Sequence, residues 1–266
     1  MDIRLNGLLV VLFVFLLTGC GSADKPAHQS NALKPLDQEE KEAIAVIEKL
    51  GGRLSGVDFP HFRSGVNTRS HLVLLNDNDV IEYDTAIENL KGLNGRIELK
   101  SVSSQITDAD LVHLNGLTNL LVLSLNNTQI SNAGLKHLKG LTILESLLLS
   151  DTQITDAGLE SLKGMPKLKN LWLDNTRISD AGLEHLKKLT DLQVLFLNNT
   201  RISDAGLEHL KEMTNLSGLY LGDTQVTDAG LVHLRGLTKL KNLRLNGTQV
   251  TKESLQKLKE ILPNLE

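Results

Sequence analysis

The stretch LKNLWLDNTRISDAGLEHL, residues 168–186, decides the fold of this chain, because its strand pattern and its helix pattern both recur along the sequence. It begins as a short strand in which Leu171 and Leu173 flank Trp172. Alternate residues of a strand point to opposite faces. If the two leucines enter a core, Trp172 is therefore expected to face water.

The same arrangement returns every 24 residues and reads LxxLxLxxTx[IV][ST]DAGLxxLKxL, with variations. Such a fixed period indicates a repeat architecture, in which each copy is one supersecondary unit. Three positions mark the register: the leucines at 123, 147, 171, 195, 219 and 243, the threonines at 128, 152, 176, 200, 224 and 248, and the isoleucines or valines at 106, 130, 154, 178, 202, 226 and 250.

Each part of the repeat has a physical interpretation. The LxL segment predicts a short strand, and the constant period predicts that these strands stack into a parallel sheet. In the copy that begins at residue 144, Thr155 is the expected helix N-cap and Asp156 lies where the helix dipole favours an anion. Leu159 and Leu162 then follow at helical spacing. No copy can bury its leucines alone, so the array must fold as a stack.

This pattern resembles the leucine-rich-repeat family, with threonine where asparagine usually stands, from about residue 97 to 262. It is especially similar to the 24-residue repeats ending TDAGL that occur in bacterial envelope proteins. The resemblance implies an α/β leucine-rich-repeat solenoid. Its curved parallel sheet would lie on the concave face and its short helices on the convex face.

The expected organisation has four parts. Residues 1–19 are a lipoprotein signal peptide, 20–36 a polar tether, 37–70 an N-terminal capping helix with an irregular cap, and 71–266 the repeat array. Within the array, 71–95 form a degenerate first repeat and 252–266 a terminal helix.

The N-terminal sequence MDIRLNGLLVVLFVFLLTGC predicts export, because a positive charge precedes an apolar run that is too short to span a bilayer. Its last four residues, Leu17 to Cys20, resemble the lipobox of bacterial lipoproteins. That resemblance implies cleavage after Gly19, a lipid on Cys20 and anchoring of an exported protein to a membrane of the bacterial cell envelope. The alternative is an ordinary cleaved signal with an incidental cysteine.

Composition narrows the function. A net charge of −4 and a pI near 6.1 argue against nucleic-acid binding, which requires a basic face. No nucleophile, phosphate-loop or metalloprotease motif is present, so we expect neither an enzyme nor a cofactor. The histidines that recur at 113, 137, 185, 209 and 233 lie on helices packed roughly 8–10 Å apart, too far to share one metal ion, and are expected to be half-buried flank residues.

The residues between the paired leucines differ between repeats and suggest a binding surface. From Leu148 to Tyr220 they would form an apolar ribbon about 14 Å long on the concave sheet. An apolar patch with a charged rim often marks an interface, although aromatic residues also suit exposed strands for packing reasons alone. We expect a protein partner; a glycan or cell-wall ligand and a structural spacer are the alternatives. The candidate partner-binding residues are Leu148, Trp172, Phe196, Tyr220 and Arg244, with Asp174, Arg177 and Arg201 at the rim.

The lipobox interpretation predicts that Cys20→Ala abolishes lipid attachment, because no other thiol is present in the chain. The variant should accumulate as unprocessed or soluble protein, which metabolic labelling with a fatty acid and membrane fractionation would measure. A variant that is still processed and still membrane-bound, with unchanged mobility, would refute the lipoprotein assignment.

Overall fold

The computed structural model describes residues 36–50, 53–56, 70–75, 83–94, 96–101 and 104–266. The chain divides into two units, Met1–Leu33 and Lys34–Glu266. The expected signal peptide, Cys20 and nearly all of the expected tether lie outside the described residues, and the description below concerns the second unit.

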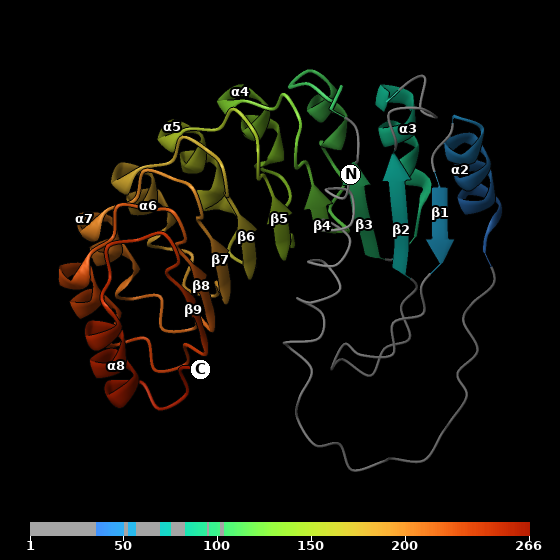
Figure 1. Ribbon diagram of the computed structural model, residues 1–266. Coiled ribbons are helices and arrows are strands. Elements are labelled where there is room, and N and C mark those ends of the chain that lie inside the picture. The colour runs from blue at the N-terminus through green and yellow to red at the C-terminus, as the bar shows by residue number, and fades with distance from the viewer. Residues whose placement is uncertain (1–35, 51–52, 57–69, 76–82, 95, 102–103) are drawn as a thin grey trace, which may run out of the picture. The chain divides into compact units, whose positions relative to one another are not determined.

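Among its described residues, the second unit has one sheet whose nine strands lie in chain order, β1 to β9 (Figure 1). All neighbours from β2 to β9 are parallel, as the repeat predicts. The strands are β1 Arg53–Gly56, β2 Ser70–Leu75, β3 Arg96–Ser101, β4 Leu120–Ser124, β5 Ser146–Leu148, β6 Asn170–Trp172, β7 Val194–Phe196, β8 Gly218–Tyr220 and β9 Asn242–Arg244.

One short helical segment follows each strand of the array, and these segments line one face of the sheet (Figure 1). Several contain a single α-helical turn that tightens into a 3-10 turn, because each repeat leaves room for few helical residues. The helical segments are α2 Gln38–Lys49, α3 Tyr83–Asn89, η1 Leu90–Gly92, η2 Asp110–Leu114, α4 Asn132–Leu135, η3 Lys136–Leu138, α5 Asp156–Leu159, η4 Glu160–Gly164, α6 Asp180–Leu186, α7 Asp204–Leu207, η5 Glu208–Leu210, η6 Asp228–Leu234 and α8 Lys252–Ile261.

The core lies between the sheet and the helical segments. Leu171 and Leu173 are completely buried, as are Leu183 and Leu186 of the following helix.

The turn after each strand is also built from repeated residues. Thr176 donates its hydroxyl to the Leu173 carbonyl at 2.6 Å, and Asn175 adopts a left-handed conformation with φ of 55°. Equivalent threonine bonds occur in the copies on either side.

At α5 the predicted N-cap residue forms no capping bond, whereas the equivalent Ser131, Ser203 and Thr227 accept a hydrogen bond from a backbone N–H of their own helices. Asp156 lies in the first turn of α5, as predicted. Thr155 stands at the N-cap of α5 but makes no side-chain capping bond; its hydroxyl accepts a hydrogen bond from Asn132. The Asp156 carboxylate accepts hydrogen bonds from the backbone N–H and the hydroxyl of Ser179 in the next repeat, at 2.7 and 2.6 Å. The aspartate therefore joins two repeats. This explains the glycine of the DAGL motif, because a Cβ on Gly182 would lie 2.5 Å from an Asp156 carboxylate oxygen.

The N-terminal end of the array is closed by α2 and β1. Asp37 caps α2 by accepting a hydrogen bond from the Glu40 N–H at 2.9 Å, and Ile47 is fully buried. The strand β1, in the segment expected to be an irregular cap, pairs antiparallel with β2. Within the described part of the chain, no helix has both the length and the apolar composition that a membrane crossing requires.

The stacked core predicts a large loss of stability for Leu171→Ala, because a fully buried side chain is replaced by a cavity. We expect the free energy of unfolding to fall by roughly 2–5 kcal/mol in chemical denaturation. The half-buried His185 on the same repeat provides the control, since His185→Ala should change stability little. Equal losses for the two variants would show that the leucine position is not part of a shared core.

Candidate functional site

The candidate residues between the paired leucines form one continuous row across the sheet. Leu148, Trp172, Phe196, Tyr220 and Arg244 are paired in register from β5 to β9. They lie on the face of the sheet opposite the buried leucines, which we call the open face, because no described helix covers it. The row is the arrangement that the repeat spacing predicts.

The three aromatic rings of this row, Trp172, Phe196 and Tyr220, stack on one another; we call them the aromatic row. The Trp172 and Phe196 ring centroids are 5.1 Å apart and those of Phe196 and Tyr220 are 4.0 Å apart, each pair within 10° of parallel. Such stacking stabilises the pair beyond simple burial, by about 0.5–1.5 kcal/mol. Because the rings cover each other's faces, Phe196 has both of its faces occupied and offers its edge to the open face.

The expectation that Trp172 faces water is wrong, although the residue lies on the predicted face. Its side chain is 5% exposed and that of Leu148 is 3% exposed, while Phe196 and Tyr220 are half-buried. Part of the reason is the narrow spacing of parallel strands, about 4.8 Å, which presses large side chains of neighbouring strands together. The indole is covered on one side by the Phe196 ring and is paired in register with Leu148 on the other.

Two polar atoms beside this row are buried without a hydrogen-bond partner among the described residues. They are the Trp172 indole nitrogen and the Asn170 side-chain oxygen, both on β6. Asn170 and Trp172 are two residues apart and therefore point to the same face. The Asn170 amide nitrogen donates to the Ser146 hydroxyl at 2.9 Å, which leaves only its oxygen unpaired. An unpaired buried polar group typically costs about 1–3 kcal/mol of stability.

Asp174 lies on the other side of the row and is fully engaged within the protein. One carboxylate oxygen accepts from the backbone N–H and the side-chain amide of Asn198, at 2.9 and 2.7 Å, and the other accepts from the Ser150 hydroxyl at 3.2 Å. Burial raises the pKa of Asp174 above its ordinary value, against the lowering effect of these hydrogen bonds. Asp174 is thus a link between repeats as well as a rim residue.

The glycines beside Tyr220 have a packing role. A Cβ on Gly222 would lie 2.8 Å from the Asn246 amide nitrogen and 2.9 Å from the Asn198 side-chain oxygen. The Gly222 N–H donates to that same oxygen at 2.7 Å. The Asn198 and Asn246 side chains can approach the backbone this closely only because residue 222 has no side chain.

The three arginines of the predicted rim do not lie together. Arg244 is exposed at the end of the row, next to Tyr220 in register. Burial raises the pKa of Tyr220, and the positive charge of Arg244 opposes that rise. Arg177 and Arg201 are exposed but follow the strand turns, where their backbones form isolated bridges to Thr155 and Ser179. They form a separate edge row.

Sequence reasoning missed a charged pair at the other end of the row. Lys100 of β3 pairs in register with Ser124, and Glu98 pairs with Val122. Their side chains lie 3.9 Å apart; burial raises the pKa of Glu98 and lowers that of Lys100. The 24-residue period could have placed Lys100 in this row, since it stands one period before Ser124. The sequence around Lys100 departs too far from the repeat pattern for that position to be recognised.

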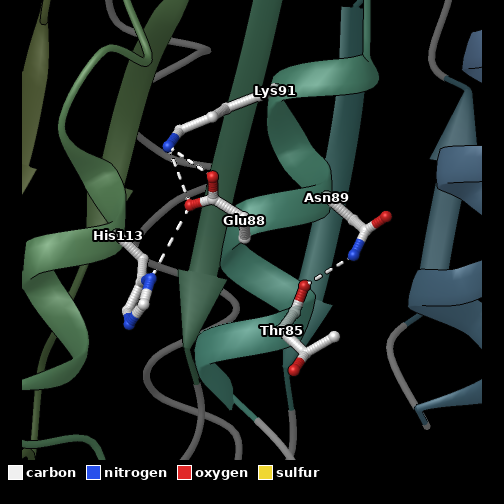
Figure 2. Close-up of polar contacts among 5 residues, drawn as sticks. All are labelled: Thr85, Glu88, Asn89, Lys91 and His113. Carbon is white, nitrogen blue, oxygen red and sulfur yellow. Dashed lines mark hydrogen bonds and ion pairs between the residues drawn. The ribbon is translucent and has the colours of Figure 1, made fainter.

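The recurring histidines lie on the helical face, away from the aromatic row, and all five are half-buried. His113 approaches the Glu88 carboxylate at 3.6 Å, and Lys91 binds the same carboxylate at 2.7 Å (Figure 2). The Lys91 hydrogen bond is the main reason that the pKa of Glu88 is lowered. Among the residues that the structure describes, no group of three or more metal-ligating side chains lies together.

A hollow of about 460 Å³ also lies on the helical face, where Ser161 takes the place of a histidine. The smaller side chain leaves space between neighbouring repeats. Its lining includes Lys136, Lys139 and Lys163, of which Lys163 approaches Glu160 at 3.5 Å. These are exposed surface side chains, so the hollow is not the candidate site.

The fold and the repeated turns define the chain as an α/β leucine-rich-repeat solenoid. A family model described as leucine-rich repeats (2 copies) matches residues 144–188 and 166–212. Among solved structures, an internalin from Listeria monocytogenes is similar, with 30% sequence identity and a TM-score of 0.54. The alignment covers 68% of this chain and 48% of the internalin, so the chain matches about half the length of that protein. No curated protein matches the chain.

The buried position of Asp174 predicts a pH-dependent effect of Asp174→Asn. A folded-state pKa above the ordinary value of 3.8 means that ionisation disfavours the folded state as the pH rises from that value through the folded pKa. The variant, which places an asparagine where Asn126 and Asn198 stand in other repeats, should melt at a higher temperature than the wild type at pH 7.

Below the unfolded pKa the aspartate is neutral in both states, and the difference in melting temperature should shrink. Thermal unfolding from pH 3 to pH 7 measures this trend. A variant that is less stable at pH 7, with the gap closing in acid, would indicate that the charge itself stabilises the ladder.

Proposed function

We propose that this protein works by binding another protein on the open face of its sheet, and not by catalysis. The observation that carries the proposal is the aromatic row with Arg244 at its end. Phe196 and Tyr220 are partly exposed there, and Arg244 is exposed. Aromatic residues and arginine supply much of the binding energy at protein interfaces. The leucine-rich-repeat architecture supports this proposal, since stacked repeats present extended surfaces that are used for binding.

The stacking geometry favours a protein over a glycan. A sugar ring binds an aromatic side chain by lying flat on the exposed ring face. Phe196 has Trp172 on one face and Tyr220 on the other, at centroid distances of 5.1 and 4.0 Å. The row therefore presents ring edges, which carry partial positive charge and suit the carbonyl oxygens and side chains of a protein.

We also propose that the protein works in the bacterial cell envelope, anchored through a lipid on Cys20. The support is the sequence alone: a charged start, a short apolar run and a lipobox-like segment that ends at Cys20. The polar segment at residues 20–36 would then separate the repeat array from the membrane.

The binding proposal predicts that Phe196→Ala and Tyr220→Ala weaken binding of an envelope protein while the fold survives. Loss of a central interface aromatic typically costs 2 kcal/mol or more, about a 30-fold weaker affinity. Val232→Ala is the matched control, because Val232 is a 48% exposed apolar residue on the helical face. The partner retained by wild-type protein would be identified by mass spectrometry, purified, and its affinity measured for each variant.

Three outcomes would contradict the proposal. Equal affinity for all variants would place the interface elsewhere. Loss of retention after enzymatic removal of glycans would identify a glycan ligand. Self-association with no retained partner, measured as mass in solution, would favour a structural spacer.

A further inference from the structure

We propose that the hollow on the helical face, whose lining includes Lys136, Lys139, Ser161 and Lys163, is a binding site for a phosphate group. The hollow lies on the side of the sheet away from the aromatic row, so this inference does not depend on the proposed protein-binding function. It starts from one place in the array where two repeat positions change together.

Four glutamates of the helical face are each followed 25 residues later, in the next copy, by a histidine. The contact is direct between Glu88 and His113, at 3.6 Å. The Lys187 hydrogen bond is the main reason that the pKa of Glu184 is lowered, and the charge of His209 adds to this effect. The pairs are Glu88 with His113, Glu160 with His185, Glu184 with His209 and Glu208 with His233.

At one place the corresponding pair is lysine and serine. Lys136 has the position of the glutamate, and Ser161, 25 residues later, has the position of the histidine. The charge is thus reversed where the imidazole ring is also missing. Lys139 follows three residues after Lys136, at the spacing at which Glu184 and Lys187 form an ion pair of 3.2 Å. Like charges this close on a helical segment repel each other.

The two extra cations have no partner within the protein. In the part of the chain that the structure describes, neither Lys136 nor Lys139 forms an ion pair or a side-chain hydrogen bond. Lys163, which also lines the hollow, approaches the Glu160 carboxylate at 3.5 Å, and both of these side chains are exposed. Such an exposed pair contributes little. Three ammonium groups and one carboxylate leave the hollow with a positive charge.

Ser161 adds an unpaired hydroxyl to the hollow. The residue is 6% exposed, and no described residue makes a hydrogen bond with its side chain. Among the described residues, the side-chain atoms that are both unpaired and sealed from solvent belong to Asn170 and Trp172. The Ser161 oxygen is therefore still reachable from solvent, and the hollow that it lines is the space beside it. A ligand in the hollow can accept the hydrogen bond of this hydroxyl.

These groups together select a phosphate. Lysine is a common phosphate ligand, because its compact charge can approach a phosphate oxygen from many directions. A tetrahedral phosphate can accept hydrogen bonds from several sides at once, whereas a carboxylate has two oxygens in one plane. The hollow of about 460 Å³ has room for the phosphate and a group attached to it, since one water takes up about 30 Å³. A phosphorylated small molecule and a lipid headgroup share this chemistry.

The chain offers a reporter in the hollow and a matched reporter outside it. Gly164 lines the hollow, and Gly236 has the same repeat position further along the array. Full-length protein labelled with ¹⁵N-glycine, in non-ionic detergent micelles, has 21 glycines to observe. Alanine substitution identifies each of the two peaks, because a Cβ at Gly164 or Gly236 meets only a backbone carbonyl, at 3.6 or 3.8 Å.

We expect inorganic phosphate, at pH 8 and constant ionic strength, to shift the Gly164 peak with saturation and to leave the Gly236 peak in place. Acetate, as the carboxylate probe, should cause no saturable shift. Phosphatidylglycerol added to the micelles is the second phosphate probe. A response to inorganic phosphate supports a soluble phosphate compound as the ligand, and a response to phosphatidylglycerol alone supports a lipid headgroup.

Two substitutions introduce residues that other repeats already have. Lys136→Glu and Ser161→His should each weaken the phosphate response about tenfold. The second change fills the hollow without adding charge, since histidine, with an ordinary pKa of about 6.5, is mainly neutral at pH 8. Lys139→Gln should also weaken the response, and Lys187→Gln, the same change at the same repeat position, should not.

Three results would overturn the site. The first is no saturable response to either phosphate probe, and the second is an equal response to acetate. The third is a failure of the variants to discriminate, either because Ser161→His binds phosphate normally or because Lys139→Gln and Lys187→Gln weaken binding equally. That last result would mean that phosphate senses only the general charge of the helical face.

Discussion

The structure depends on the inability of a single repeat to bury its own leucines. Each short strand and helix has one apolar side, and that side is covered only when the next repeat stacks on it. Leu147, Leu171 and Leu195 are completely buried for this reason, because each lies between the equivalent residues of its neighbours. The stability of any one repeat is therefore shared with the repeats on both sides.

Polar ladders turn this stacking into a defined register. On the helical side, Asp156 and Asp180 bind the backbone and hydroxyl groups of Ser179 and Ser203 in the following copies. On the open face, Asn198 links Asp174 to the Gly222 backbone. Both ladders are short and directional, so a strand cannot slip against its neighbour without breaking them. The aromatic row owes its parallel stacking to this fixed register.

Much of the fold follows from the sequence because the 24-residue period carries the strand, turn and helix signals together. The period also places Trp172, Phe196 and Tyr220 in one row correctly. It does not reveal that Trp172 is buried, since exposure depends on side chains that lie one repeat away in sequence and one strand away in space. The role of Asp156 was missed for the same reason: its partner, Ser179, belongs to the next copy. The antiparallel β1 lies outside the period altogether.

Because side chains alternate along each strand, core packing and surface chemistry depend on different residues of the same short segment. At the inward positions, every repeat from β4 to β9 has leucine, while the intervening position holds serine, leucine, tryptophan, phenylalanine, tyrosine or arginine in turn. Folding therefore fixes leucine at the inward position and accepts several kinds of side chain at its neighbour. An array of this kind can diversify its surface one substitution at a time while the leucine core stays the same. Duplication of a repeat would add a new surface position and a new core layer in the same event.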